Sequence, residues 1–273
     1  MPISNSTRPE TRFAPALQRI MTRSRLYPFI EHYSLNVVQM LPGGDDFLGD
    51  TLRTDIYTVS NGGGAGAASP VITANSLNGV CDFVTGTANG STASSELSTG
   101  LAFRGDRSCV MVALLSIDVI TGVKVEVGFT DVNNDPGAVN VKATPTFTAT
   151  DCALWVLDTN DNGNWEGLAA NNGDTAPMAT VEAGISPTAG TLEWLMVELL
   201  RNDSASNECA VIFRRFTEAG LMTYEAVGGQ ANPQGPNSNV LLTPWVYVEA
   251  RNASSKTLSL DYWNAWQFRT IPV

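Results

Sequence analysis

The sequence predicts an all-β protein, an antiparallel two-sheet sandwich preceded by an extended N-terminal arm. From Asp46 onward, short apolar runs are separated by Gly, Asn, Asp and Pro at the spacing typical of sandwich strands. Several of these runs alternate apolar and polar residues with period two, and no convincing long helix follows residue 45. With 273 residues, 43% of them hydrophobic, the chain can bury a sizeable core without a disulfide or a metal.

The arm, residues 1–44, differs from the sandwich domain, residues 45–273, in charge and composition. Residues 1–33 hold five arginines and two glutamates, a net charge of +3, and the whole chain carries −11, so residues 34–273 carry −14. Prolines break any long helix, although residues 16–26 could form a short one with an apolar face of Leu17, Ile20 and Met21. A solvated tail is one interpretation. The many apolar residues favour docking on a surface through Arg8, Arg12, Phe13, Leu17, Arg19, Arg23, Arg25, Tyr27 and Phe29.

The strands of the sandwich are expected in twelve short runs. They span residues 52–59, 77–84, 95–104, 108–117, 123–130, 151–158, 177–182, 192–201, 208–217, 221–227, 241–251 and 258–268. In residues 123–130 the alternation predicts a core face of Val and Phe and a water-facing side with Lys124 and Glu126. The last run predicts one apolar face made of Leu258, Leu260, Tyr262, Trp266 and Phe268.

Two runs are apolar on both faces. In residues 108–117, Val110, Val112 and Leu114 lie opposite the face that starts with Cys109, and residues 192–200 show the same property. A two-sheet sandwich buries one face of each strand, so something else must cover the second face. The cover could be the arm, a loop of this chain or another subunit. A central strand under a long loop is the ordinary interpretation, and an interface strand is the alternative.

The four cysteines, Cys81, Cys109, Cys152 and Cys209, are far apart, and the only histidine, His32, lies in the arm. This spacing indicates neither a zinc site nor a redox motif. Each cysteine lies in an apolar, strand-like run, which favours buried free thiols over two disulfides. We expect no membrane segment and no secretion signal, and hence synthesis in the cytoplasm. A pI near 4.5 disfavours a nucleic-acid partner.

The motifs of hydrolases, phosphate sites and dinucleotide sites are missing from the sequence. A resemblance enters with the segment Asp45-Asp46-Phe47-Leu48-Gly49-Asp50-Thr51-Leu52-Arg53-Thr54-Asp55-Ile56-Tyr57 and the closing residues 258–266. They resemble the first and last strands of concanavalin-A-like (laminin-G-like) jelly rolls. Residues 125–131, 151–159 and 241–245 are similar to tailed-phage structural proteins of this fold. The resemblance covers about residues 45–273 and implies a capsid decoration-type protein.

The glucanases of that fold carry closely spaced carboxylates on one strand. The nearest candidates here, Glu193 and Glu198, are five residues apart and therefore on opposite faces of a strand, so we expect no enzyme. Binding of sugar without catalysis stays open, because Trp165 lies in a Gly- and Asn-rich stretch and could act as a sugar platform. Tryptophan in a sandwich more often belongs to the core.

A calcium loop is the sharpest local motif. Asp158, Asn160 and Asn162, followed by Gly163, match the first half of such a loop, but its twelfth position is Ala169 instead of a bidentate glutamate. An ordinary turn is the alternative, and no other cofactor is indicated.

These observations lead to two hypotheses. The first is a structural virion protein of a tailed bacteriophage, a capsid decoration or cement protein made in the host cytoplasm. It would dock on the major capsid protein or other virion subunits through its arm, as a homo-oligomer or on a lattice, without nucleic acid or membrane. The second is a non-catalytic carbohydrate- or receptor-binding module of a tail or adhesion apparatus. It would use loops 131–145 and 158–176.

Overall fold

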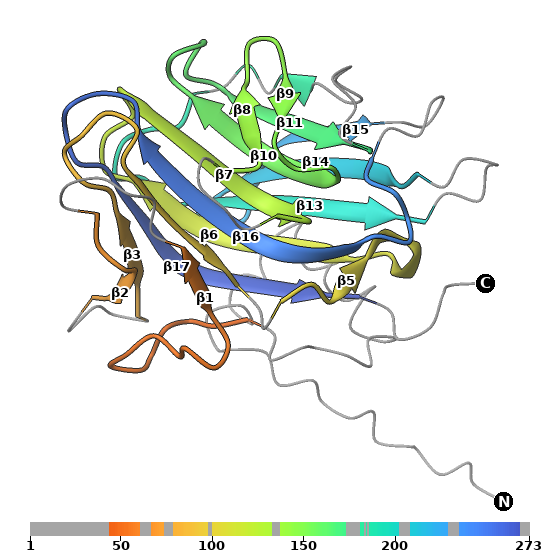
Figure 1. Cartoon of the computed structure of the whole chain (residues 1–273), viewed down its shortest axis with the longest axis horizontal. Helices are drawn as coiled ribbons and strands as arrows, with labels where there is room; N and C mark the ends of the chain where they lie inside the picture. The colour runs from red at the N-terminus through yellow and green to blue at the C-terminus, as the bar shows by residue number, and fades with distance from the viewer. Residues whose placement is uncertain are drawn as a thin grey trace, which may run out of the picture.

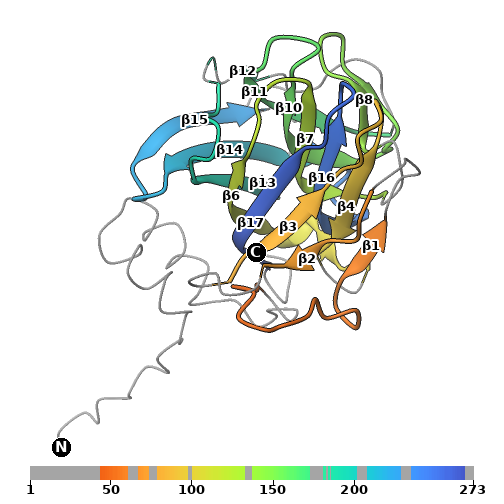
Figure 2. The ribbon, with the colours of Figure 1, turned by 90° about the vertical axis from the view of Figure 1, so that its left-hand side faces the viewer.

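Two antiparallel β-sheets, packed face to face, make up most of the chain, as a computed structural model shows from two directions (Figures 1 and 2). The structure describes residues 44–60, 67–73, 79–97, 100–132, 137–172, 181–182, 184, 186–201, 208–228 and 235–267. The predicted all-β two-sheet sandwich is confirmed.

The front sheet has the strand order β1-β4-β16-β7-β10-β11-β12, with β5 beside β16. Its strands are β1 (Thr58–Ser60), β4 (Thr92–Glu96), β5 (Phe103–Arg104), β7 (Val123–Thr130), β10 (Cys152–Asp158), β11 (Trp165–Ala170), β12 (Val181–Glu182) and β16 (Leu241–Ala250). The back sheet has the order β15-β14-β13-β6-β17-β3-β2. Its strands are β2 (Val71–Ile72), β3 (Cys81–Val84), β6 (Val110–Ile117), β13 (Glu193–Leu200), β14 (Ala210–Thr217), β15 (Met222–Gly228) and β17 (Thr257–Trp266).

A third, two-stranded sheet lies between β7 and β10 in the sequence. It consists of β8 (Val139–Val141) and β9 (Thr146–Phe147), called the hairpin below. A short 3-10 helix, η1 (Gly105–Arg107), precedes β6. None of the described helical residues forms a helix long and apolar enough to cross a membrane.

The main core lies between the two sheets, where strand alternation directs one face of each strand inward. Met111 and Leu115 of β6 meet Val125 and Phe129 of β7 in this core, together with Trp155 of β10. A second cluster lies on the outer side of the front sheet, where the hairpin packs on it, and includes Val139, Leu154, Val156, Trp245 and Tyr247. The front sheet is therefore covered on both sides.

Several predicted runs match observed strands closely, among them β6, β7, β10 and β13, whereas three predictions were wrong in part or in full. Within residues 52–59 only the end, from Thr58, is strand, and the run 95–104 is divided between β4 and β5. The stretch that holds Trp165 is not a loop, because Trp165–Ala170 forms β11. There, a Cβ on Gly167 would lie 2.4 Å from the Phe213 ring, so glycine permits the close approach of the two sheets.

The predicted single apolar face of the last strand is also wrong. The pairing of β17 with β6 shifts between Leu260 and Tyr262, so one extra residue, Asp261, exchanges the faces. Leu258 and Leu260 lie in the core before the bulge, and Trp263 lies there after it. As a result, Tyr262 and Trp266 face the outside of the back sheet, and Phe268 lies outside the described residues.

All four cysteines are buried free thiols, as expected from their apolar settings. Burial raises the pKa of the Cys81 and Cys209 thiols to about 12. Thiols with such a pKa are poor nucleophiles at neutral pH, because the thiolate is the reactive form.

Candidate functional site

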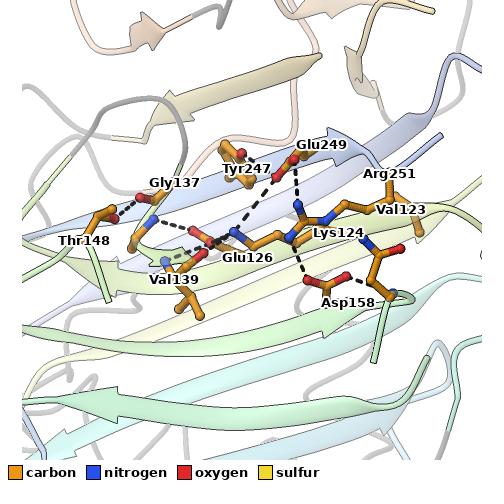
Figure 3. A network of polar contacts seen from close by, with 12 residues as sticks. Val123, Lys124, Glu126, Gly137, Val139, Thr148, Asp158, Tyr247, Glu249 and Arg251 are labelled. Carbon is orange, nitrogen blue, oxygen red and sulfur yellow. Dashed lines mark hydrogen bonds and ion pairs between the residues drawn. The ribbon is translucent and has the colours of Figure 1, made fainter. Parts of the chain in front are cut away.

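The densest group of described charged residues lies on the outer side of the front sheet, under the hairpin (Figure 3). It starts with Lys124 and Glu126 of β7, whose Nζ and Oε1 atoms lie 2.8 Å apart while their side chains are 1% and 0% exposed. The prediction that this side of β7 faces water is therefore wrong. Alternation correctly separated the two faces of the strand but could not show that a later segment of the chain covers the polar one.

The register of the sheet places further charges beside this pair. Glu249 of β16 and Asp158 of β10 are the direct neighbours of Lys124 on its two sides. Arg251 bridges them, with Nη1 2.8 Å from Glu249 Oε1 and Nη2 2.7 Å from Asp158 Oδ2. The hydroxyl of Tyr247 donates a hydrogen bond to Glu249 Oε2 at 2.9 Å. Burial raises the pKa of Glu249, and the positive charges of Arg251 and Lys124 partly offset this effect.

The hairpin is attached to the sheet through the Lys124–Glu126 pair. The two carboxylate oxygens of Glu126 accept hydrogen bonds from the backbone amides of Ala138, at 2.8 Å, and Val139, at 3.0 Å. The ammonium of Lys124 donates to the carbonyl oxygen of Val139. Gly137 has a φ of +94°, and a Cβ there would lie 2.8 Å from Glu126 Oε1. Glycine at this position therefore allows the hairpin backbone to descend onto the carboxylate.

The contacts of the Glu126 carboxylate decide whether it could act as a catalytic group. A general acid or base must reach a substrate proton, and a retaining glycosidase needs a pair of carboxyl groups open to the sugar. The Glu126 carboxylate instead bonds two backbone amides, the Lys124 ammonium and the indole nitrogen of Trp245, the last at 3.3 Å. This arrangement fixes the hairpin and leaves its central carboxylate buried.

The predicted calcium residues lie next to this network, and the side-chain oxygens of Asp158 and Asn162 have cationic partners. Asp158 pairs with Arg251 as described above. The ammonium of Lys142, from the turn of the hairpin, lies 2.7 Å from Asn162 Oδ1 and 2.8 Å from the Asn164 carbonyl oxygen. It also lies 3.4 Å from carboxylate oxygens of Asp161 and Glu166. The buried ammonium of Lys142 thus takes the Asn162 oxygen of the predicted set together with other oxygens of the same loop. Asn160 contributes a backbone amide to Asp158, at 3.0 Å.

The two glutamates of β13 point to opposite sides of the back sheet, as their spacing predicts. Glu193 lies on the core side, where it forms an ion pair with Arg215 and accepts a hydrogen bond from Trp165 Nε1 at 2.9 Å. Glu198 lies on the outer side and forms an ion pair with Arg214. The two carboxylates therefore cannot act as a catalytic pair.

Trp165, considered above as a sugar platform, is fully buried, and this hypothesis is wrong. All six tryptophans of the sequence are at most 4% exposed, so none offers a ring to a ligand at the surface. The loop pair proposed for ligand binding is also wrong in part, because residues 131–145 contain β8, which covers the front sheet, and residues 158–176 contain β11.

A cavity of about 400 Å³ opens at the end of the back sheet, where β13 begins and the turn between β14 and β15 lies. Four threonines contribute to its wall, and the Glu193–Arg215 ion pair and Glu218 add charged groups to it. The threonines are Thr188, Thr191, Thr217 and Thr223. Sequence reasoning missed this cavity, because its residues come from three separate segments and match no motif.

The two predicted sets of docking residues, in the arm and on the interface strand, differ in whether the structure describes them. Arg8, Arg12, Phe13, Leu17, Arg19, Arg23, Arg25, Tyr27 and Phe29 lie outside the described residues. The proposed interface strand is described: Val110 and Val112 are 0% exposed and Leu114 is 6% exposed, on the outer side of β6. Both faces of this strand are thus buried.

Solved structures with the same architecture share little sequence with this chain. A protein of unknown function from Shewanella oneidensis MR-1 has a TM-score of 0.56 at 13% identity, covering 90% of this chain and 97% of its own. Peanut lectin has a TM-score of 0.51 at 10% identity, covering 81% and 97%. The fold is a concanavalin-A-like jelly roll.

A protein of Mycobacterium tuberculosis described as an immunostimulatory antigen and pseudo β-1,3-glucanase has a TM-score of 0.50 at 11% identity, covering 85% of this chain and 99% of its own. The sequence matches no protein-family model and no curated protein. Lectins and glucanase-like proteins thus share this jelly roll, and the similarity concerns the fold alone.

Proposed function

We propose that this chain is a non-catalytic structural protein of a tailed-phage virion, a decoration or cement protein that attaches to the shell. The observation that carries the proposal is that the described groups best suited to chemistry or to sugar binding are engaged inside the fold. Glu126, Glu193 and Glu198 are buried in ion pairs, and all six tryptophans are buried. Such a body is suited to a mechanical role.

The charge division supports attachment through the arm. Five arginines lie within residues 1–33, whereas residues 34–273 carry a net charge of −14. An acidic body limits self-association and leaves the arm as the segment that attracts an acidic partner. The expected partner is therefore an acidic protein surface of the shell.

The first test is to locate the protein. An antibody raised against residues 45–273 should detect the chain in density-purified phage particles from the source culture, at a copy number suited to a lattice. Detection only in the soluble fraction would overturn the virion assignment. The second test replaces the five arginines of the arm by glutamine and measures cosedimentation with particles that lack the protein. Undiminished attachment would exclude the electrostatic role of the arm.

A second candidate function, a carbohydrate- or receptor-binding module, is favoured by the threonine-lined cavity beside β13. Its threonine hydroxyls and its charged groups are suited to hydrogen bonding with a small polar ligand such as a sugar. A glycan array should then give signals that Glu218→Ala abolishes. A matched control, Asp55→Ala, changes an exposed carboxylate elsewhere and should leave these signals unchanged.

A further inference from the structure

The outer side of the back sheet carries an apolar face that spans four strands. Three rows of paired residues cross β14, β13, β6 and β17, and their register defines which side chains share the face. The apolar members, called the outer apolar face below, are Val110, Val112, Leu114, Trp194, Met196, Ile212, Phe216, Tyr262 and Trp266.

These side chains are buried although they point away from the core. Met196 is 1% exposed, Trp194 2% and Trp266 4%. A sheet face that is open to water leaves such large side chains in contact with solvent, so a further layer must cover this one. The described elements do not supply that layer, because the two described hydrophobic clusters contain none of these residues. The elements in close contact with β6 are its sheet neighbours and β7, across the core.

The described chain begins at the edge of this face. Asp45 pairs with Trp263 of β17 through backbone hydrogen bonds of 3.1 and 3.2 Å. A Cβ on Gly44 would lie 2.9 Å from Cγ of Asn264, which belongs to the middle row of the face. The preceding residue, at position 43, is thus attached directly beside the face.

The length of the undescribed segments restricts which of them can form the cover. Residues 1–43 form the longest, whereas each of the others has at most eight residues. Four strands spaced about 4.8 Å apart span roughly 15 Å, which an extended chain crosses in about five residues. A layer over three rows therefore needs several crossings, which only residues 1–43 can make. The same segment contains Phe13, Leu17, Ile20, Leu26, Tyr27, Phe29, Ile30 and Tyr33.

We propose that residues 1–43 cover the outer apolar face of their own chain, with the apolar side chains packed on the sheet and the arginines directed outward. The arm is then the outermost layer of the domain. This inference does not depend on the proposed virion role. It changes the expected role of Phe13, Leu17, Tyr27 and Phe29, which pack on the back sheet of their own chain instead of on the surface of a partner.

The test uses a photoreactive p-benzoylphenylalanine placed in the full-length chain at Ile212 or, separately, at Trp266, at two ends of one row of the face. A matched control places it at Leu221, which is 59% exposed on the turn between β14 and β15. Equal amounts of unlabelled and 15N-labelled protein are mixed, irradiated and digested. Mass spectrometry then identifies the cross-linked peptides and their isotope composition.

The proposal expects peptides from residues 1–43 as the main products at positions 212 and 266, at least tenfold above position 221. Both halves of each product should carry the same isotope label. Mixed labels would show that a second copy supplies the cover and would overturn the proposal, as would products that lack arm peptides at both positions.

A second variant pair gives an independent readout. Replacing Leu17, Ile20 and Met21 by aspartate should expose the outer apolar face, shift tryptophan emission to longer wavelength and increase binding of a hydrophobic dye severalfold. The same charge change at Ser6, Thr22 and Ser24 should do neither. Equal spectra for the two variants would contradict the proposal.

Discussion

Glu126→Ala is expected to detach the hairpin from the front sheet and to destabilise the whole domain. The substitution removes the acceptor of the Ala138 and Val139 amides and the partner of the Lys124 ammonium. It leaves a buried cation near Glu249, whose carboxylate is 4.0 Å away, and two backbone amides without their acceptor. The hairpin then has to be hydrated or displaced.

The expected loss in the free energy of unfolding is about 4 kcal/mol. Breaking a buried ion pair by removing one partner costs roughly 3–5 kcal/mol, which already includes part of the lost hydrogen bonding. Each hydrogen bond to a charged group contributes about 1.5–3 kcal/mol when taken alone, but these contributions overlap and do not add. For a domain whose total stability is about 5–15 kcal/mol, such a loss is easily measured.

The assay is urea unfolding followed by tryptophan fluorescence, with hydrogen exchange at the Ala138 and Val139 amides as the local readout. Lys124→Met combined with Glu126→Leu should cost about 2 kcal/mol less than the sum of the single changes, because the pair is lost as a unit. Asp55→Ala, in an exposed ion pair, should leave the unfolding midpoint unchanged. A loss below about 1 kcal/mol for Glu126→Ala, with both amides still protected, would refute the anchoring role.

Three further predictions concern other positions. The pKa of Asp261 is raised to about 6 by burial and by the nearby charges of Glu218 and Asp46, so the folded state binds the proton more tightly than the unfolded state and stability falls as pH rises from 4 to 6. Asp261→Asn should therefore stabilise the domain by about 1 kcal/mol at pH 7.5, after allowing for solvent screening of this half-exposed group, and by almost nothing at pH 4, in denaturant titrations at both pH values. Gly167→Ala should lower the free energy of unfolding by about 2 kcal/mol in the same titration, because its methyl group would overlap the Phe213 ring. Gly49→Ala, whose nearest atom would be 3.8 Å away, should be close to neutral. Similar losses at both sites would contradict this reasoning. Lys142→Ala should lower the melting temperature. Millimolar calcium should raise it again in the variant but not in the unmodified protein, since the ion would take the place of the ammonium. Stabilisation of the unmodified protein by calcium would show that the lysine does not exclude the ion.

Period-two alternation predicted the inner faces of the strands because these depend on local spacing alone. Val125 and Phe129 were placed in the core correctly, and Glu193 and Glu198 were placed on opposite faces from their odd separation. The two arginines that pair with these glutamates, Arg214 and Arg215, are adjacent in β14 and so point to opposite faces as well. This adjacency was a usable signal for the ion pairs.

The outer faces were harder to predict because distant segments decide them. Lys124 and Glu126 are typical of a water-facing side, and only the fold brings the hairpin over them. The bulge at Asp261 exchanges the faces of β17, and no glycine or proline at this position indicates it in the sequence. The strand Trp165–Ala170 contains no β-branched residue, and it was missed because close packing against Phe213, not propensity, requires Gly167 there.

The two outer sides of this jelly roll are both buried, and this restricts where a partner can bind. The hairpin forms hydrogen bonds to a buried carboxylate on the front sheet. The outer apolar face of the back sheet needs an apolar layer, for which we propose the arm. Once both sides are covered, contact with a partner is left to the rim and to the outermost layer. The rim holds the threonine-lined cavity, and the outermost layer presents the arginines of the arm. The Glu218→Ala and arginine-to-glutamine variants act on these two surfaces separately. Loss of particle attachment in the arginine variant alone would therefore support the virion role over ligand binding at the cavity, and the opposite result would reverse that order.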